Sequence, residues 1–392
     1  MNIFLPNTIK RLINIFNKNN FKCFVVGGAI RDILLNISPK EFDLCTNAHT
    51  KDIKHMFEKF IDRGEAHGCI KVYFENNWYE ITSFRFENSY KDFRHPEFIT
   101  LLSSHEFDSI RRDFTINSLY FDGKDLVDMF NGKYDLENKL IRLIGDKNLK
   151  LREDPLRILR GLKLKSKLNF NFEFETLLSI KNNFHLITKL TKFRIHDELS
   201  EIFSNKHFLP SLKIFISLNG FSLILNREIK FLNIDKLLKI PNKFHLKLFC
   251  LLYFHSNLNK EILIKILNEH FNFKKLEMDE IKILFSILKH NILNPNSIFI
   301  KELILKFNYE TTFNICSILN TYFNFKIDKF FKIKWGNSPI KISHLNIRAY
   351  DFVSNKKKVN KYNSYLITLC HKYPKLNNQK SLKHLIKNAP IK

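Results

Sequence analysis

The chain has 392 residues, 44% of them hydrophobic, which is enough apolar side chain for two or three packed domains. It carries 64 Lys and Arg against 39 Asp and Glu, a formal net charge of +25. No apolar run approaches the roughly 20 residues that span a bilayer. The six cysteines are widely spaced without a C-x-x-C pair, so a disulfide scaffold and a zinc finger are excluded and the reducing cytoplasm is favoured.

The positive charge is concentrated in the second half of the chain. Residues 1–200 contain 32 Lys and Arg against 27 Asp and Glu, whereas residues 201–392 contain 32 against 12. A coding bias toward Lys, Asn, Ile and Phe would add lysine everywhere and does not explain the shortage of acids. A polyanionic partner for the second half explains it, and a basic solubilising surface is the alternative.

The first predicted elements lead to a pair of glycines. A helix is expected over residues 6–18 and a short strand over residues 21–26, before Gly27 and Gly28. A new helix begins after the glycines. Glycines at such a turn let backbone N–H groups approach a phosphate, and a helix N-terminus favours anions. Ordinary turn chemistry is the commoner explanation of a glycine pair.

Two acids, Glu41 and Asp43, follow on the next predicted strand, residues 41–45. Side chains at i and i+2 of a strand share a face. Such a pair can hold Mg²⁺, which prefers carboxylate oxygens and is often completed by substrate phosphates. A solvated strand face is the alternative.

A helix from Thr50 to Phe60, capped by Thr50, is expected next. Cys69–Glu75 and Trp78–Phe86 then predict a β-hairpin around Asn76-Asn77. Glu80 lies on its second strand and could face the same pocket as the acid pair. Asn88–Ser104 has no clear period and predicts a long loop, of the kind that is usually functional or disordered.

Arg111, Arg112 and Asp113 begin the string RRDFTINSL. Guanidinium groups donate bidentately to phosphate and a carboxylate accepts from hydroxyls, so the trio suits a triphosphate and a ribose. An ion pair on a helix surface is the usual alternative.

Asp154, Arg157 and Arg160 are spaced i, i+3 and i+6 on a helix that begins around Pro155, so they share one face. A carboxylate that accepts from an amino group, beside an arginine that donates to a ring nitrogen, matches both cytosine and adenine. Guanine and uracil would leave these groups mispaired. A helix stabilised by its own surface charges is the alternative.

The order Gly-Gly-x-x-Arg-Asp (27–32) and then Glu-x-Asp (41–43) resembles the active-site signature of the nucleotidyltransferase superfamily that includes DNA polymerase β. In particular, the chain resembles the class II tRNA nucleotidyltransferases (CCA-adding enzymes) and their bacterial poly(A) polymerase relatives. The RRDFTINSL string matches the second motif of that family nearly letter for letter. The resemblance covers residues 21–200 and fades beyond them.

The resemblance implies an α+β fold. A polymerase-β-like nucleotidyltransferase head with a small mixed β-sheet would span residues 1–125, a helical neck residues 126–203, and an all-α, RNA-binding body and tail residues 204–392. Glu41 and Asp43 would hold Mg²⁺, with Glu80 as a third catalytic carboxylate. The nucleotide-binding residues would be Gly27, Gly28, Arg31, Arg112, Asp113, Asn117, Asp154, Arg157, Arg160 and Lys163.

In the family, the Asp154 and Arg157 positions template the incoming base, and an arginine often stands where this chain has Lys163. The expected function is template-independent addition of CCA to the 3′ end of tRNA from CTP and ATP by two-metal nucleotidyl transfer. The expected location is the cytoplasm, with no membrane and no protein partner that can be inferred. His67-Gly68 and the Tyr90–Pro96 part of the predicted loop both resemble CCA-adding enzymes.

Three alternatives remain open. A bacterial poly(A) polymerase and an enzyme that adds only CC share these motifs. An RNA-binding protein that has lost catalysis is the third, because Glu41 stands where the family has aspartate. One extra methylene moves a carboxylate by about 1 Å, and a misplacement of that order can cost roughly 10²-fold in rate.

Overall fold

The computed structural model describes residues 3–90, 96–101, 104–293, 295, 297–327, 345 and 356–387. The chain divides into two compact units. Unit 1 comprises Met1–Ile229 with His270–Asn272, and unit 2 comprises Lys230–Glu269 with Phe273–Lys392. Across the described residues, we find no helix with the length and apolar character needed to cross a membrane.

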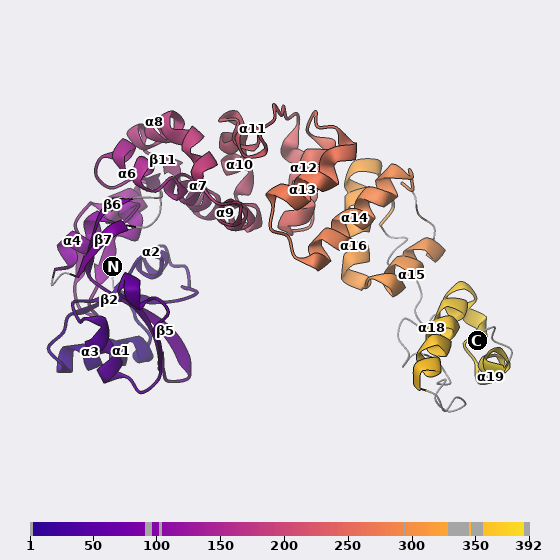
Figure 1. The fold of residues 1–392 in the computed structure, drawn as a ribbon, viewed down its shortest axis with the longest axis horizontal. Helices are drawn as coiled ribbons and strands as arrows, with labels where there is room; N and C mark the ends of the chain where they lie inside the picture. The colour runs from indigo at the N-terminus through magenta and orange to yellow at the C-terminus, as the bar shows by residue number, and fades with distance from the viewer. Residues whose placement is uncertain are drawn as a thin grey trace. The chain divides into compact units, whose positions relative to one another are not determined.

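A seven-stranded mixed sheet organises the first part of unit 1, with the strand order β3-β4-β5-β2-β1-β8-β9 (Figure 1). The parallel pair β2–β5 lies beside antiparallel pairs, which confirms the predicted mixed sheet. The strands are β1 Cys23–Val26, β2 Asp43–Thr46, β3 Phe60–Ile61, β4 Cys69–Phe74, β5 Asn77–Ser83, β8 Leu119–Phe121 and β9 Leu126–Asp128.

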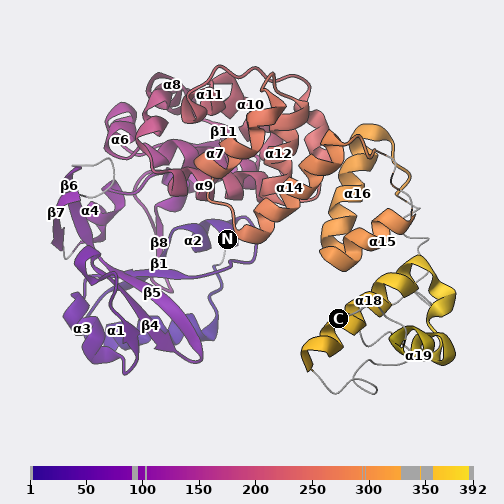
Figure 2. The same ribbon diagram turned by 45° about the vertical axis from the view of Figure 1, so that its right-hand side comes forward.

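Three helices accompany these strands: α1 (Asn7–Lys18), α2 (Gly28–Leu34) and α3 (Thr50–Met56). Helix α1 buries Ile9, Leu12, Ile13 and Phe16, a single apolar stripe at helical spacing, and it contacts β1. Helix α3 contacts β4, and α2 contacts β1 and β8 (Figures 1 and 2). The end of β1 and the start of α2 are therefore fixed against the middle of the sheet.

Two predicted boundaries in this region were wrong. Strand β2 begins at Asp43, so Glu41 lies in the loop before the strand and not on it. Helix α3 ends at Met56, and its cap is His49, which forms a capping box with Asp52. The reason is tertiary: residues after Phe57 leave the helix because Phe60–Ile61 pairs with β4 as the edge strand β3.

The segment predicted as a long loop contains a hairpin. β6 (Arg85–Tyr90) pairs antiparallel with β7 (Pro96–Leu101) in a two-stranded sheet, and residues 91–95 between them lie outside the described residues. The two strands of such a ribbon are joined by hydrogen bonds between their backbones, which any extended residues can form. The ribbon therefore needs no alternating apolar pattern that would reveal it in the sequence.

The rest of unit 1 is mainly helical. Helix α7 packs against α9 and α10, and a two-residue parallel pair, β10 (Leu140–Ile141) with β11 (Asn171–Phe172), interrupts the predicted helical neck. The helices are α4 His105–Ile110, α5 Gly132–Glu137, α6 Lys147–Glu153, α7 Leu156–Leu168, α8 Phe174–Asn183, α9 Lys192–Ser204, α10 Phe208–Ser217 and α11 Gly220–Leu225, with 3-10 turns η1 Glu65–His67, η2 Thr115–Asn117 and η3 Phe184–Lys189.

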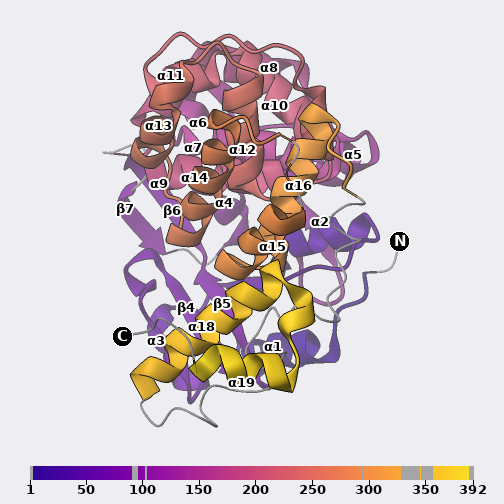
Figure 3. The same cartoon turned by 90° about the vertical axis from the view of Figure 1, so that its right-hand side faces the viewer.

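The described part of unit 2 is helical, as predicted, apart from one isolated bridge between Phe231 and Ser256. Near its C-terminal end, α18 contacts α19 around Leu366, Cys370, Leu382 and Ile386 (Figure 3). The elements are η4 Ile234–Lys239, α12 Phe244–Phe254, η5 Lys260–Ile262, α13 Leu263–His270, α14 Lys275–Lys289, α15 Ser297–Lys306, α16 Tyr309–Phe323, α18 Lys356–Lys372, η8 Pro374–Leu376 and α19 Gln379–Lys387.

Candidate active site

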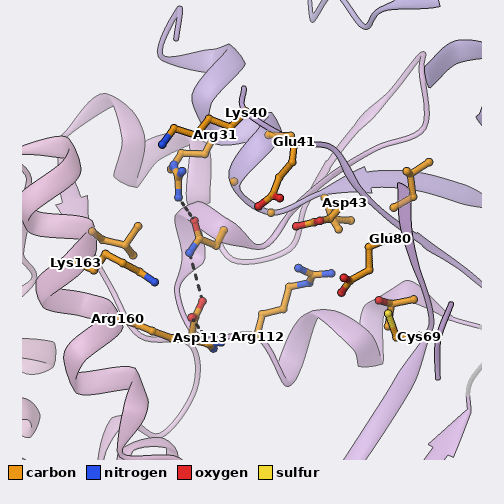
Figure 4. A pocket seen from close by; sticks show the side chains of 18 of the residues that line it. Arg31, Lys40, Glu41, Asp43, Cys69, Glu80, Arg112, Asp113, Arg160 and Lys163 are labelled. Atoms are coloured by element: carbon orange, nitrogen blue, oxygen red, sulfur yellow. Dashed lines mark hydrogen bonds and ion pairs between the residues drawn. The ribbon is translucent and has the colours of Figure 1, made fainter. Parts of the chain in front are cut away.

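A cavity of about 1200 Å³ in unit 1 gathers all of the site residues that the sequence predicted (Figure 4). They come from the glycine turn, the strands β2 and β5, the segment around η2, and helix α7 with the residues before it. The lining includes Gly27, Gly28, Arg31, Glu41, Asp43, Glu80, Arg112, Asp113, Asn117, Asp154, Arg157, Arg160 and Lys163. Predicted site residues up to 136 positions apart in the sequence, Gly27 and Lys163, thus share one solvent space.

Three carboxylates lie on one side of the cavity. Asp43 opens β2, and β5 runs parallel beside it with Leu44 opposite Ile81, so Glu80 neighbours Asp43 across the pair. Glu41 reaches the same space from the preceding loop (Figure 4). Desolvation by the cavity walls, with the charges of Glu41 and Glu80, raises the pKa of Asp43 to about 6. Because neighbouring negative charges disfavour its ionised form, this carboxylate would be stabilised by a cation beside it.

The carboxylates are not a closed metal cage. Nowhere in the described part of the chain do three His, Cys, Asp or Glu side chains come close enough together to hold an ion. Lys71 Nζ lies 3.6 Å from a Glu80 oxygen, so Glu80 has a cation of its own. Glu41 and Asp43 remain as a pair that is open to oxygens from a substrate.

The glycine turn is fixed by Gly27, whose φ of +71° is in the left-handed region that favours glycine. Arg31, one turn later, is buried and its charge is already engaged. It donates to Asp32 Oδ1 from Nε at 2.9 Å and from Nη2 at 2.7 Å, and to Asn117 Oδ1 from Nη1 at 2.6 Å. Arg31 therefore braces the turn against η2 as well as lining the cavity.

Ion pairs join helix α7 to the glycine-turn side of the cavity at two points. Lys167 Nζ lies 2.8 Å from Asp32 Oδ2, and Arg160 Nη1 lies 3.5 Å from Asp113 Oδ2. The Asn117 amide donates weakly to Asp113 at 3.5 Å (Figure 4). The predicted nucleotide-binding residues on the two sides are thus connected through charged contacts.

The predicted base-reading residues differ in how they are held. Burial raises the pKa of Asp154, against the opposing charges of Arg160, Arg157 and Arg194. The Arg157 side chain is only 4% exposed and donates to Lys150 O at 2.8 Å, to Glu153 Oε2 at 3.3 Å and to Arg111 O at 3.2 Å. Arg157 therefore also locks α7 to α6 and to the RRD segment.

Lys163, predicted to bind nucleotide, lines the cavity but is paired with a neighbouring helix. Its Nζ lies 2.8 Å from Glu198 Oε2 on α9. This pair links α7 with α9, whose Arg194 also faces the cavity.

Comparison with known proteins agrees with this geometry. Residues 23–142 match the family model of the poly A polymerase head domain, and residues 169–225 match that of the probable RNA and SrmB-binding site of polymerase A. A CCA-adding enzyme of Lactobacillus helveticus is 39% identical over 197 residues, which are 50% of this chain and 49% of the relative. One of Lactobacillus johnsonii is 41% identical over 183 residues, 46% of each.

Two segments of the chain are thus similar to the poly A polymerase domains, and about half of the chain is similar to CCA-adding enzymes. It spans about half the length of the curated relatives it matches. The crystal structure of a Bacillus stearothermophilus CCA-adding enzyme in complex with CTP matches 98% of both chains with a TM-score of 0.73 at 18% identity. A Thermotoga maritima CCA-adding enzyme complexed with tRNA has a TM-score of 0.62 at 19% identity and covers 98% of this chain and 96% of its own. The likeness of fold thus extends well beyond the residues whose sequence is similar.

Sequence reasoning missed several residues that shape the cavity. Lys40, Lys167 and Arg194 all line it, and none was named as a site residue. Asp108, which lies behind the arginines, was missed as well. It precedes Arg111 and Arg112 by three and four positions, a helical spacing that could have indicated their contact.

Proposed function

We propose that this chain adds CCA to the 3′ end of tRNA, without a nucleic-acid template, from CTP and ATP. The observation that carries the proposal is the single cavity in which Glu41 and Asp43, the glycine turn and the Asp154–Arg157 segment meet. These are the parts that a nucleoside triphosphate needs for its metal, its phosphates and its base. The match to the poly A polymerase head domain and the similarity to relatives named CCA-adding enzymes support the same reaction.

The reaction replaces one phosphorus–oxygen bond by another. The RNA 3′-hydroxyl oxygen attacks the α-phosphorus of the bound nucleotide, the bond to the β-phosphate oxygen breaks, and pyrophosphate leaves while the hydroxyl proton passes to solvent. The charge of the triphosphate is balanced by cations that line the cavity, among them Arg112 and Lys40. Helix α2 has only seven residues, so its dipole is weak. The charge of the triphosphate would therefore be balanced mainly by side-chain cations.

The donors fit Mg²⁺ as the ion. Glu41 and Asp43 supply hard carboxylate oxygens, and the incomplete cage leaves positions for phosphate oxygens and water, as Mg²⁺ prefers. When bound, the ion would lower the pKa of the 3′-hydroxyl and neutralise charge on the leaving pyrophosphate.

Base choice would come from Asp154, with Arg157 beside it. Asp154 accepts from the amino group that cytosine and adenine share, and Arg157 donates to the adjacent ring nitrogen. Because Arg157 is held by Lys150 O and Arg111 O, it would present its guanidinium in a fixed plane. A fixed pair of buried polar groups rejects guanine and uracil, which cannot satisfy it.

The basic half of the chain would hold the tRNA. Residues 201–392 have 32 Lys and Arg against 12 Asp and Glu, and lysine and arginine bind the phosphate backbone with release of counterions. A reaction on tRNA would place the protein in the cytoplasm.

The test is incubation of the purified chain with tRNA that lacks its CCA end, with CTP, ATP, GTP and UTP supplied singly and together. We expect two additions with CTP alone and a third only when ATP is also present. Long tails from ATP alone on a generic RNA would assign the chain to the poly(A) polymerases. Two additions that never proceed to a third would indicate a CC-adding enzyme, and no incorporation at all an RNA-binding protein.

A further inference from the structure

A buried acid behind the cavity holds two of its arginines. Asp108, on α4, is completely buried, and burying a carboxylate is costly unless it is paired and hydrogen-bonded. It accepts from Arg111 Nε at 2.8 Å, from Arg112 Nη2 at 3.2 Å and from Tyr120 Oη at 2.8 Å. Although burial opposes its ionisation, the charges of Arg111 and Arg112 lower the pKa of Asp108.

These contacts determine which edge of Arg112 faces the cavity. Arg112 Nε donates to Tyr120 Oη at 2.7 Å, and its guanidinium carbon lies 4.9 Å from the Tyr120 ring centroid. With Nε and Nη2 engaged, Nη1 is the remaining nitrogen. It lies at the glycine turn, where a Cβ added to Gly27 would be 3.8 Å from it. Figure 4 shows the same guanidinium near Asp43 and Glu80.

Arg112 thus lies between two groups of acids, Asp108 behind the cavity and the pair Asp43 and Glu80 within it. It is a cation beside the carboxylates of Asp43 and Glu80, and its charge opposes the raised pKa of Asp43. Yet among the described residues its ion-pair partner is Asp108, and neither Asp43 nor Glu80 lies within ion-pairing distance of it. A guanidinium free to turn would be drawn to Asp43 and Glu80, since opposite charges in a partly desolvated site attract strongly.

We propose that Asp108 and Tyr120 are positioning residues that hold Arg112 at the glycine turn, so that it meets the triphosphate instead of pairing with Asp43 and Glu80. The proposal rests on the proposed nucleotidyl transfer and adds two residues that act through a third. Neither Asp108 nor Tyr120 lines the cavity, so neither would touch the nucleotide itself.

The experiment is calorimetric titration of the full chain with CTP and Mg²⁺ in the absence of RNA. Asp108→Asn should weaken CTP binding about tenfold, the scale of a lost hydrogen bond to a charged group. Arg112→Gln should weaken it similarly in the wild-type background but add less than twofold to Asp108→Asn, because the two act as one unit. Mn²⁺ binding without nucleotide, followed by electron paramagnetic resonance, should also weaken in Asp108→Asn and recover in the double variant.

A matched control separates positioning from stability. Asp135 is also buried and accepts from Arg142 Nε at 3.0 Å and Thr115 Oγ1 at 2.6 Å, but it does not line the cavity. Asp135→Asn should lower the melting temperature and leave the CTP affinity unchanged. Tyr120→Phe removes one contact to Arg112 and should weaken CTP binding by about threefold, even if Asp108→Asn does not fold.

Unchanged CTP affinity in Tyr120→Phe and in any folded Asp108→Asn protein would overturn the proposal. The proposal would also be overturned if Arg112→Gln lowered the CTP affinity of Asp108→Asn as much as it lowers that of the wild-type chain. Failure of the wild-type chain to bind CTP or to extend tRNA would instead contradict the proposed function, so the two failures are distinguishable.

Discussion

The two halves of the chain use charge in different ways. In residues 1–200 the bases and acids are nearly balanced, 32 against 27, and the structure joins them into pairs that reach far across the sequence, as Lys167 does with Asp32. In residues 201–392 there are 32 bases but only 12 acids. The first half uses charge to fix side chains in one geometry, whereas the second carries an excess that its own acids cannot balance.

This difference explains why the similarity to known proteins ends earlier in sequence than in fold. Transfer of a nucleotide needs particular atoms in particular positions, so the residues around the cavity are constrained one by one. Binding to RNA phosphates needs enough cations on a surface but no particular arrangement of them. Contacts to the RNA backbone do not depend on its base sequence. The second family model accordingly ends at residue 225, whereas the fold likeness reaches 98% of the chain.

The sharpest test of this division is Asp43→Asn. We expect nucleotide transfer to fall by at least about 10²-fold, because a carboxylate of the metal site stabilises charge in the transition state. Affinity for tRNA should change by less than twofold, since a carboxylate in the cavity does not attract an RNA phosphate. Single-turnover extension and filter binding measure the two effects, with Asp125→Asn, an exposed acid outside the cavity, as the control. Near-normal turnover would refute the metal role.

Substitution of the base-reading acid should change nucleotide choice more than rate. Asp154→Asn should reduce the preference for CTP over UTP by roughly 10²-fold, because its amide can donate to the carbonyl that the carboxylate rejects. The measurement is kcat/KM for each nucleotide in turn. Glu153→Gln is the matched control, since Glu153 contacts Arg157 but does not line the cavity. Unchanged selectivity in Asp154→Asn would remove its templating role.

Neutralising lysines should affect RNA binding in only one half. The exposed residues Lys275, Lys289 and Lys380 belong to unit 2. Their combined change to Gln should weaken tRNA binding and reduce the slope of log K against log salt by up to about 0.9 for each lysine that meets a phosphate.

The matched triple variant changes Lys51, Lys124 and Lys181, exposed lysines of unit 1, to Gln. It should leave the slope nearly unchanged. Equal effects of the two triple variants would mean that the charge excess of the second half is not the tRNA grip.

The affinity for Mg²⁺ should depend on pH through Asp43. Its pKa of about 6 means that a proton occupies the carboxyl below pH 6, and a metal must displace that proton. Affinity should therefore fall by up to about tenfold per pH unit below pH 6 and level off above it. Glu80→Gln removes one charge that raises this pKa and should move the bend to lower pH, which Mn²⁺ titration across pH 5–8 would show.

Glu41→Asp should give the smallest change. The variant has the shorter aspartate side chain that the resemblance predicts at this position, and the rate should stay within a few-fold of wild type or rise. Glu41 reaches the cavity from a loop and not from β2, so the loop can adjust to either length. A loss as large as that of Asp43→Asn would show that the geometry is tuned to glutamate.

Local pattern sufficed to find most of the cavity. The glycine pair, the acid pair and the RRD string could each be identified from residue types and spacing alone. All three line the same cavity. What the pattern could not show is which groups pair across the fold. From the sequence, Lys167 is indistinguishable from a surface lysine, whereas in the structure its Nζ lies 2.8 Å from Asp32. Likewise, the sequence does not show that Arg157 donates to the backbone carbonyls of Lys150 and Arg111.

Backbone pairing was equally hidden in the β6–β7 hairpin. Its sequence has no alternating apolar pattern, because its ladder needs only extended backbone on both sides. The start of β2 at Asp43 depends on partners in β1 and β5, which local sequence does not contain.

The most direct test of the central claim is end-sequencing of tRNA that has been extended by the wild-type chain with all four nucleotides present. We expect products that end in CCA, with no fourth nucleotide and no G or U. Tails of many A residues, or ends that include G and U, would contradict it.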